Sequence, residues 1–87
     1  MTELRDHELL LPYPCSWVYK VIGESEAGVR EAIAEVLQNR VHEVRLSRKS
    51  SGGRYCSFSV ETTVYDERDR VGLYRALSGH ALVRIVL

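Results

Sequence analysis

Residues 50–65 read SSGGRYCSFSVETTVY, and this stretch decides the fold that we predict. Gly52 and Gly53 mark a turn, because glycine accepts positive φ angles without a steric cost. After the turn the residues alternate, and one side of the alternation holds Cys56, Phe58, Val60, Thr62 and Val64. A period of two over ten residues predicts a β-strand with one buried and one open face. Its length favours the middle of an antiparallel sheet.

The composition is that of a single globular domain. A chain of 87 residues has no room for a second domain, and 45% hydrophobic and 28% charged residues are ordinary values. Lys and Arg number 12, as do Asp and Glu, so the net charge gives no sign of a nucleic acid or anionic membrane partner. No apolar run approaches the ~20 residues of a membrane span, and the first residues do not resemble a signal peptide. We therefore expect a soluble cytoplasmic protein.

The first part of the chain predicts a lead-in arm over residues 1–14 and a domain over 15–87. Three leucines at 9–11 precede Pro12 and Pro14, which favour an extended path. We expect the arm to lay its leucines on the domain. Cys15 and Cys56 lack CxxC spacing, which predicts small buried thiols in a reducing compartment.

The next residues predict a strand over 16–22 and then a helix. Trp17, Tyr19 and Val21 alternate with Val18, Lys20 and Ile22, and the aromatic set is the expected buried side. Ser25 is the expected N-cap of the helix. Its apolar stripe consists of Val29, Ile33, Val36 and Leu37.

The remaining chain predicts a strand, the glycine hairpin, a second helix and a last strand. Residues 42–48 alternate and carry many charges, which is typical of an edge strand. Asp66 is the expected cap of the second helix and Gly79 its end. The inner side of this helix is expected to consist of Val71, Tyr74 and Leu77, with Leu73 beside them. Residues 81–87 complete the pattern as a strand.

The element order is therefore β-α-β-β-α-β. Right-handed crossovers leave space in each half for a strand of the other half, which predicts the sheet order 4-1-3-2. Both helices then cover one face of the sheet. The predicted fold is an α+β ferredoxin-like sandwich with an antiparallel sheet.

Three runs of sequence resemble the YbeD-like family of short bacterial proteins of unknown function. They are YPCSWVYKVIG (13–23), SSGGRYCSFSVET (50–62) and LYRALSGHALVRIVL (73–87), and the resemblance extends from about Leu9 to Leu87. It implies an ACT-like domain, a class that senses small molecules or oligomerises, and a genetic context near lipoate attachment. The family brings no catalytic residues to carry over. Arg70 stands where the family pattern expects an apolar residue, which leaves the rotation of the second helix open.

No metal or cofactor is expected. His7, His42 and His80 lack helical i, i+4 spacing, and no cysteine stands near enough to complete a zinc pattern. The loop after the first strand is a possible ligand loop at Gly23, Glu24 and Ser25, because glycine permits close approach. Its carboxylates would repel a phosphate, and it has no thiols for copper. Plain turn glycine is the competing interpretation.

We expect no catalysis. Ser57 and Ser59 on the open face lack a histidine to activate them. An RNA-binding domain is the alternative function, because the fold is shared with domains that stack bases on outward aromatics. Tyr55 points outward in the predicted strand but Phe58 points inward, so that motif is half present.

The open sheet face is the predicted interaction site. If Val83, Ile85 and Leu87 face the helices, then Leu82, Arg84 and Val86 lie on the open face beside the first strand. An aliphatic patch with charges at its rim favours a protein partner or a weak homo-oligomer, and an acidic partner suits the cations. The competing interpretation is that residues 1–14 cover this face. A small-molecule effector is also compatible. The predicted face consists of Val18, Lys20, Ile22, Tyr55, Ser57, Ser59, Glu61, Leu82, Arg84 and Val86.

Overall fold

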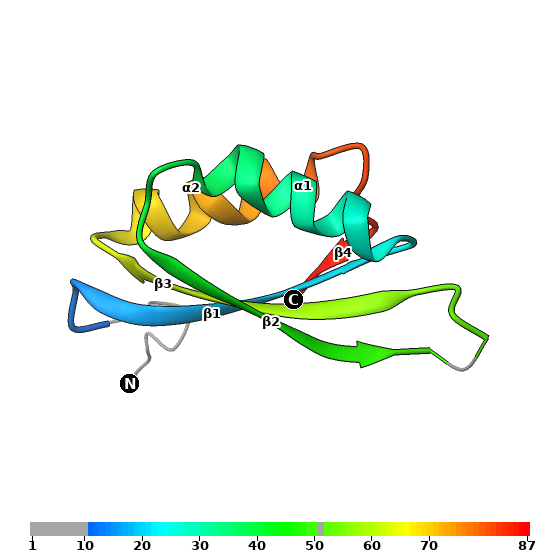
Figure 1. Cartoon of the computed structure of the whole chain (residues 1–87). Helices are drawn as coiled ribbons and strands as arrows, with labels where there is room; N and C mark the ends of the chain where they lie inside the picture. Colours follow the sequence, from blue (N-terminus) through cyan, green and yellow to red (C-terminus); the bar gives the residue numbers. More distant parts are fainter. Residues whose placement is uncertain (1–10, 51) are drawn as a thin grey trace, which may run out of the picture.

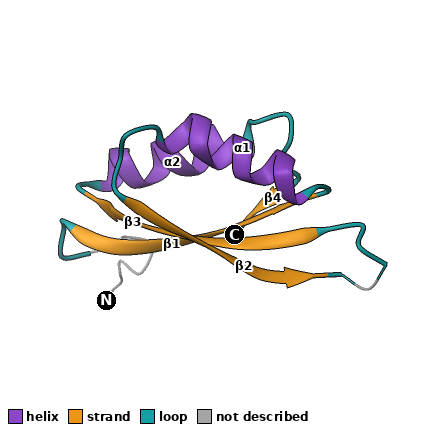
Figure 2. Cartoon of the chain, viewed as in Figure 1, coloured by secondary structure: helices purple, strands orange, loops and turns teal. Residues whose placement is uncertain are grey.

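A computed structural model describes residues 11–50 and 52–87. In chain order its elements are β1 (Cys15–Gly23), α1 (Glu26–Leu37), β2 (His42–Lys49), β3 (Cys56–Val64), α2 (Glu67–Ser78) and β4 (Ile85–Val86). The two helices lie side by side on one face of a twisted sheet, and none of the described residues forms a helix on the other face (Figures 1 and 2). This is the two-layer α+β arrangement that the sequence predicts.

The sheet has the order β2-β3-β1-β4, and each neighbouring pair is antiparallel. Counted from the β4 edge, this is the order 4-1-3-2 that the crossover rule predicts. Strand β3 pairs along its full length with β1, from Cys56 opposite Gly23 to Val64 opposite Cys15. Strand β2 forms one edge of the sheet, as its charged sequence indicates.

Each helix begins at the predicted cap. The Ser25 side chain accepts a hydrogen bond from the Gly28 amide at 2.8 Å, and the Asp66 carboxylate accepts one from the Asp69 amide at 2.7 Å. These bonds satisfy amides that have no partner inside the helix. The capping residues therefore fix where both helices start over the sheet.

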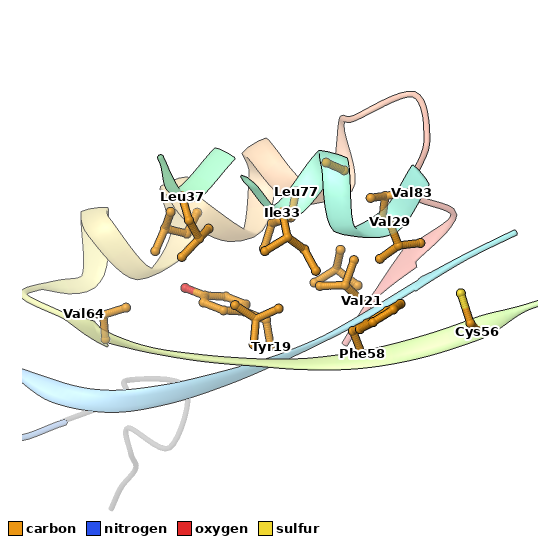
Figure 3. Packing of buried hydrophobic residues seen from close by; sticks show 14 residues of the cluster. Tyr19, Val21, Val29, Ile33, Leu37, Cys56, Phe58, Val64, Leu77 and Val83 are labelled. Carbon is orange, nitrogen blue, oxygen red and sulfur yellow. The ribbon is translucent and has the colours of Figure 1, made fainter. Parts of the chain in front are cut away.

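The core lies between the helices and the inward rows of β1 and β3 (Figure 3). Phe58, Val60 and Val64 are fully buried, as are Val21 and Val29, and Cys56 and Tyr19 are nearly so. Ile33, Leu37 and Leu77 close this layer from the helices. The residues predicted to face inward from β1 and β3 are confirmed as buried except for Trp17, which is partly buried, as is Val36 of the predicted α1 stripe.

Helix α2 is rotated relative to the predicted orientation. Leu73 and Leu77 are its buried residues, whereas Tyr74 is 45% exposed and Val71 is half-buried. The Arg70 side chain contacts two aromatic side chains, and a third aromatic residue bonds the Arg70 backbone carbonyl.

These aromatic side chains come from β1 and the segment before it. The Tyr19 hydroxyl donates to the Arg70 carbonyl at 2.7 Å, and Arg70 Nε donates to the Tyr13 hydroxyl at 3.0 Å. The Arg70 guanidinium lies 5.0 Å from the centre of the Trp17 ring. Burial raises the pKa of Tyr19 to about 12, so its hydroxyl remains a donor. The cation–π contact with Trp17 and the hydrogen bond to the Tyr13 hydroxyl thus explain an arginine at position 70 in place of an apolar residue.

Strand β4 is shorter than predicted. Only Ile85 and Val86 are strand residues, although Arg84 and Leu87 also donate backbone hydrogen bonds to β1, each at 2.8 Å. The turn at 79–82 includes residues 81 and 82, which were predicted to belong to the strand. Of the predicted arm over residues 1–14, residues 1–10, with Leu9 and Leu10, lie outside the described residues. Of the described part of the arm, Tyr13 packs against the core.

Phe58→Ala tests the assignment of the two faces of β3. Phe58 is fully buried, so its truncation should lower the free energy of unfolding by about 3–5 kcal/mol, measured by urea denaturation. Val41→Ala is the control, since Val41 is 90% exposed and its truncation should change stability little. A Phe58→Ala protein as stable as the parent would show that the faces are reversed.

Candidate interaction face

The face of the sheet that carries no helix, here called the open face, brings together side chains of β1 and β3. Val18 lies opposite Glu61, Lys20 opposite Ser59, and Ile22 opposite Ser57. Val18 is 52% exposed, whereas Ile22 is half-buried. Six of the ten residues predicted for this face are therefore neighbours across one strand pair.

Two of the predicted residues do not belong to the open face. Val86 is only 5% exposed and lies opposite the buried Val21, so its predicted exposure is wrong. Leu82 is 42% exposed, but its side chain reaches the start of α1, where it lies near Gly28. Both errors arise from the turn before β4, because it makes Val83 and Val86, three residues apart, the inward pair.

Ile85 takes the place that was predicted for Val86. It is 50% exposed, lies opposite Ile22, and with Tyr55 and Arg84 lines a shallow hollow of about 510 Å³. The exposure of Ile85 on the open face could be predicted only if the first residue of β4 were known. The apolar part of the open face therefore consists of Val18, Ile22, Tyr55 and Ile85.

Charges surround this apolar part. Arg84 Nη2 donates to Glu24 Oε2 at 2.6 Å, and the negative charge of Glu24 raises the pKa of Arg84 above its usual value. Both side chains are more than half exposed. This pair joins the last strand to the loop after β1 at the rim of the open face.

The other end of the open face carries rows of like charge. Glu43 of β2 lies opposite Glu61 of β3, and the Ser16 hydroxyl donates to Glu61 Oε2 at 2.6 Å. One row along, Arg45 and Lys20 lie on either side of Ser59. Together with Val18, the acidic pair and Arg45 border a second shallow hollow of about 330 Å³. The open face therefore has an acidic row beside a basic one.

The predicted ligand loop is packed by the protein itself. A Cβ atom at Gly23 would lie 2.4 Å from Val29 Cγ2 and 2.7 Å from the Leu82 carbonyl oxygen. Gly23 is thus required by the close approach of β1 to α1 and to the turn before β4. Glu24 and Ser25 do line an open hollow of about 300 Å³, with Arg84 on its other side.

The histidines that the structure describes are held by local contacts. His80 Nδ1 accepts from the Leu82 amide at 3.1 Å, so Nε2 is its protonated nitrogen in the neutral ring and lies 2.7 Å from Glu35 Oε1. This hydrogen bond lowers the pKa of Glu35. His42 Nδ1 lies 2.6 Å from the Arg40 carbonyl oxygen. Within residues 11–50 and 52–87 no three His, Cys, Asp or Glu side chains gather as metal ligands.

Arg40 and Asp69 form an ion pair that joins the end of α1 to the start of α2. Arg40 also donates to the Thr63 carbonyl at 3.0 Å, and Asp69 accepts from the Tyr65 amide at 3.0 Å. Burial alone would raise the pKa of Asp69, but the hydrogen bonds from Arg40 and Tyr65 outweigh it, so the pKa is lowered. The cluster is a structural clamp.

The cysteines are free, and burial raises the pKa of the Cys56 thiol. A thiol with a raised pKa is a poor nucleophile. Within the part of the chain that the structure describes, no helix is long and apolar enough to cross a membrane.

The fold and the open face define a small α+β sandwich domain in which the described residues place both helices on one face of the sheet. The family model described as "Protein of unknown function (DUF493)" matches residues 8–87. The chain therefore belongs to this family of bacterial proteins, the YbeD-like group that its sequence resembles.

Relatives in other bacteria match along nearly the whole chain. A UPF0250 protein of Paraburkholderia phytofirmans is 34% identical over 85 residues, which cover 93% of this chain and 96% of the relative. A UPF0250 protein of Neisseria gonorrhoeae is 30% identical over 92 residues, and the match covers both chains completely.

A solved structure supports the fold. The solution structure of protein HP0495 from Helicobacter pylori matches with a TM-score of 0.80 at 21% identity, covering 100% of this chain and 96% of that one. A second solution structure of HP0495 matches with a TM-score of 0.63 at 23% identity, covering 97% of this chain and all of that one. At this identity the similarity concerns the fold alone.

Substitution of two glycines tests the packing beneath the loop after β1. Gly23→Ala should destabilise the protein by about 1–3 kcal/mol, because the added methyl group overlaps Val29 and the Leu82 carbonyl. Gly72→Ala should stabilise it by up to about 1 kcal/mol, since nothing lies within 4 Å of that position in α2. Equal effects of the two substitutions in thermal denaturation would contradict this account of Gly23.

Asp69→Asn tests the clamp through pH. Because the pKa of Asp69 is lower in the folded than in the unfolded chain, its stabilising contribution is complete above about pH 5. It is lost as pH falls through the folded-state pKa. The stability difference between parent and Asp69→Asn in urea should therefore shrink from pH 6 to pH 3. A difference that stays constant over this range would exclude the clamp, and Glu67→Gln on the same helical turn is the control.

Proposed function

We propose that this chain is a non-catalytic interaction module whose open face binds an acidic partner protein. The observation that carries the proposal is an apolar strip with cations beside it, on a sheet surface that carries no helix. The strip consists of Val18, Ile22, Tyr55 and Ile85.

The apolar strip supplies the attraction. Val18 and Ile85 are each about half exposed, and full burial of such a side chain is worth roughly 1.5–3 kcal/mol. The remaining burial of each therefore contributes roughly half of that amount. Association carries a cost of several kcal/mol, so this strip alone supports a weak contact.

The positive charges on the open face favour a partner with acidic side chains. Lys20 lies between Val18 and Ile22 on the same strand face, and Arg84 borders the hollow beside Ile85. Acidic side chains on a partner would meet both cations and would steer association. The Arg84 guanidinium can replace the carboxylate of Glu24 by a carboxylate of the partner, because both side chains of this ion pair are exposed to solvent.

The hairpin adds further positive charge beside the open face. Three of the chain's 12 cations stand at Arg45, Arg48 and Arg54, with no acid between Glu43 and Glu61, whereas Lys49 is paired with Glu26 of α1. The β2–β3 hairpin extends beyond the helices (Figure 1). An acidic partner that crosses the open face would therefore also meet this hairpin.

RNA is the alternative partner, and the same cations are the observation that favours it. The contribution of aromatic stacking to RNA binding would be weak, because Tyr55 is the one aromatic among the residues assigned above to the open face, while Phe58 is fully buried. Base stacking usually requires two or three aromatics on the central strands. Nuclease treatment separates the two partners experimentally.

Sensing of a small effector and a link to lipoate metabolism are implications of the family resemblance. The hollow lined by Ile22, Tyr55, Arg84 and Ile85 is the place where an effector with an apolar body and a negative group would bind. Because this hollow is part of the apolar strip, an effector would compete with the partner protein or complete its site.

The test replaces the two exposed aliphatic residues by acids. Val18→Glu together with Ile85→Glu should leave the melting temperature within a few degrees of the parent, because both side chains are half exposed. Used as bait in nuclease-treated extract, the double variant should lose the acidic partner that the parent retains. We expect at least a tenfold loss of affinity, equivalent to about 1.4 kcal/mol.

Tyr74→Glu is the matched control, since Tyr74 is 45% exposed on the helical layer. It should keep the partner. Retention by the parent should fall with added salt, because exposed charges are screened. A double variant that keeps every partner would contradict the proposal, and retention that disappears with nuclease would favour RNA.

A further inference from the structure

The outer edge of β2 is a second surface, distinct from the open face. Among the described residues, β2 has β3 on one side and no strand on the other. An unpaired edge is a template for another strand, and proteins usually protect it with charge or a bulge. Strand β2 has a bulge between Leu46 and Arg48, which leaves His42 to Leu46 as its regular part.

The hydrogen-bond pattern shows which backbone groups point outward from this edge. Lys20 exchanges both backbone hydrogen bonds with Leu87, so its neighbours in β1 bond to β3. Because backbone groups alternate in direction along a strand, the amides and carbonyls of Ser59 and Glu61 in β3 point toward β2. There they pair with the backbone of Arg45 and Glu43. The amides and carbonyls of His42, Val44 and Leu46 therefore point away from the sheet.

We propose that a second copy of this chain pairs with this edge, antiparallel and centred on Val44. In that register Val44 lies opposite Val44 of the other copy, and His42 lies opposite Leu46. These are the residues whose backbone groups point outward, so each opposing pair exchanges two hydrogen bonds. The two sheets join into one continuous sheet of eight strands.

The charges of β2 select this register. Glu43 of one copy lies opposite Arg45 of the other, and the twofold symmetry repeats the pair. A register centred on Glu43 or on Arg45 would place like charges opposite each other, which is unfavourable. A register centred on Leu46 would extend across the bulge. Within one chain Arg45 Nη2 lies 3.5 Å from Glu43 Oε1, and both side chains are more than 70% exposed, so each can exchange this partner for the opposite charge of a second copy.

The apolar side chains fit the same arrangement. Leu46 is 41% exposed although it lies opposite the buried Phe58, on the same side of the strand as Val44. A second copy would place His42 against it. The ladder is only five residues long, so the expected dimer depends on protein concentration.

Charge reversal tests the register directly. Arg45→Glu places Glu43 opposite an acid, and Glu43→Arg places Arg45 opposite a base, so each single variant should weaken self-association by at least about tenfold. Mixing the two variants restores opposite charges at both positions. Sedimentation of the full-length parent should show a dimer, each variant alone a monomer, and the mixture a heterodimer.

The controls separate this edge from general charge effects. Arg48→Glu makes the same reversal on the same strand beyond the bulge and should dimerise like the parent. Glu43→Arg combined with Arg45→Glu should also dimerise. A parent that remains monomeric up to about 1 mM, single variants that still dimerise, or a mixture of the two that remains monomeric would overturn the proposal.

Discussion

The structure depends on the central position of β3. This strand pairs with β1 on one side and β2 on the other, and its inward row supplies Phe58, Val60 and Val64 to the core. Because strand residues alternate between faces, burial of this row fixes the outward row of Ser57, Ser59 and Glu61. A shift by one residue would bury the polar row. The two faces of the sheet are thus settled by one constraint, and the residue composition of the open face follows from it.

The edges of the sheet follow a different rule from its centre. In β2 the register with β3 is fixed, yet the backbone groups of His42, Val44 and Leu46 point outward, and the ion pair of Glu43 and Arg45 beside them is exposed. At the other edge, β4 is two residues long and the Arg84–Glu24 pair lies at its rim. The domain therefore has a closed helical layer, an open face and one long edge.

The sequence predicts the elements whose signals are local. Ser25 and Asp66 are recognisable caps because their side chains satisfy amides within the next turn. The alternation of β3 is likewise a local pattern. The rotation of α2 was not predictable, because Arg70 is held by Tyr13 and Trp17, which are more than fifty residues away in the chain. Val86 was placed on the wrong face since the turn before β4 displaces the alternation, and Gly23 proved to be a packing residue because its close neighbours come from α1 and from residue 82.

Binding of a partner to the open face requires that its apolar strip is accessible in the whole chain. Methyl NMR spectra of the full-length protein with a soluble paramagnetic agent test it most directly. Val18 and Ile85 methyl signals should broaden strongly, whereas those of Val21, Val60 and Val86 should be protected, as their burial requires. Protection of Val18 and Ile85 to the same degree as Val60 would contradict the account, because the strip would then be covered by the chain itself.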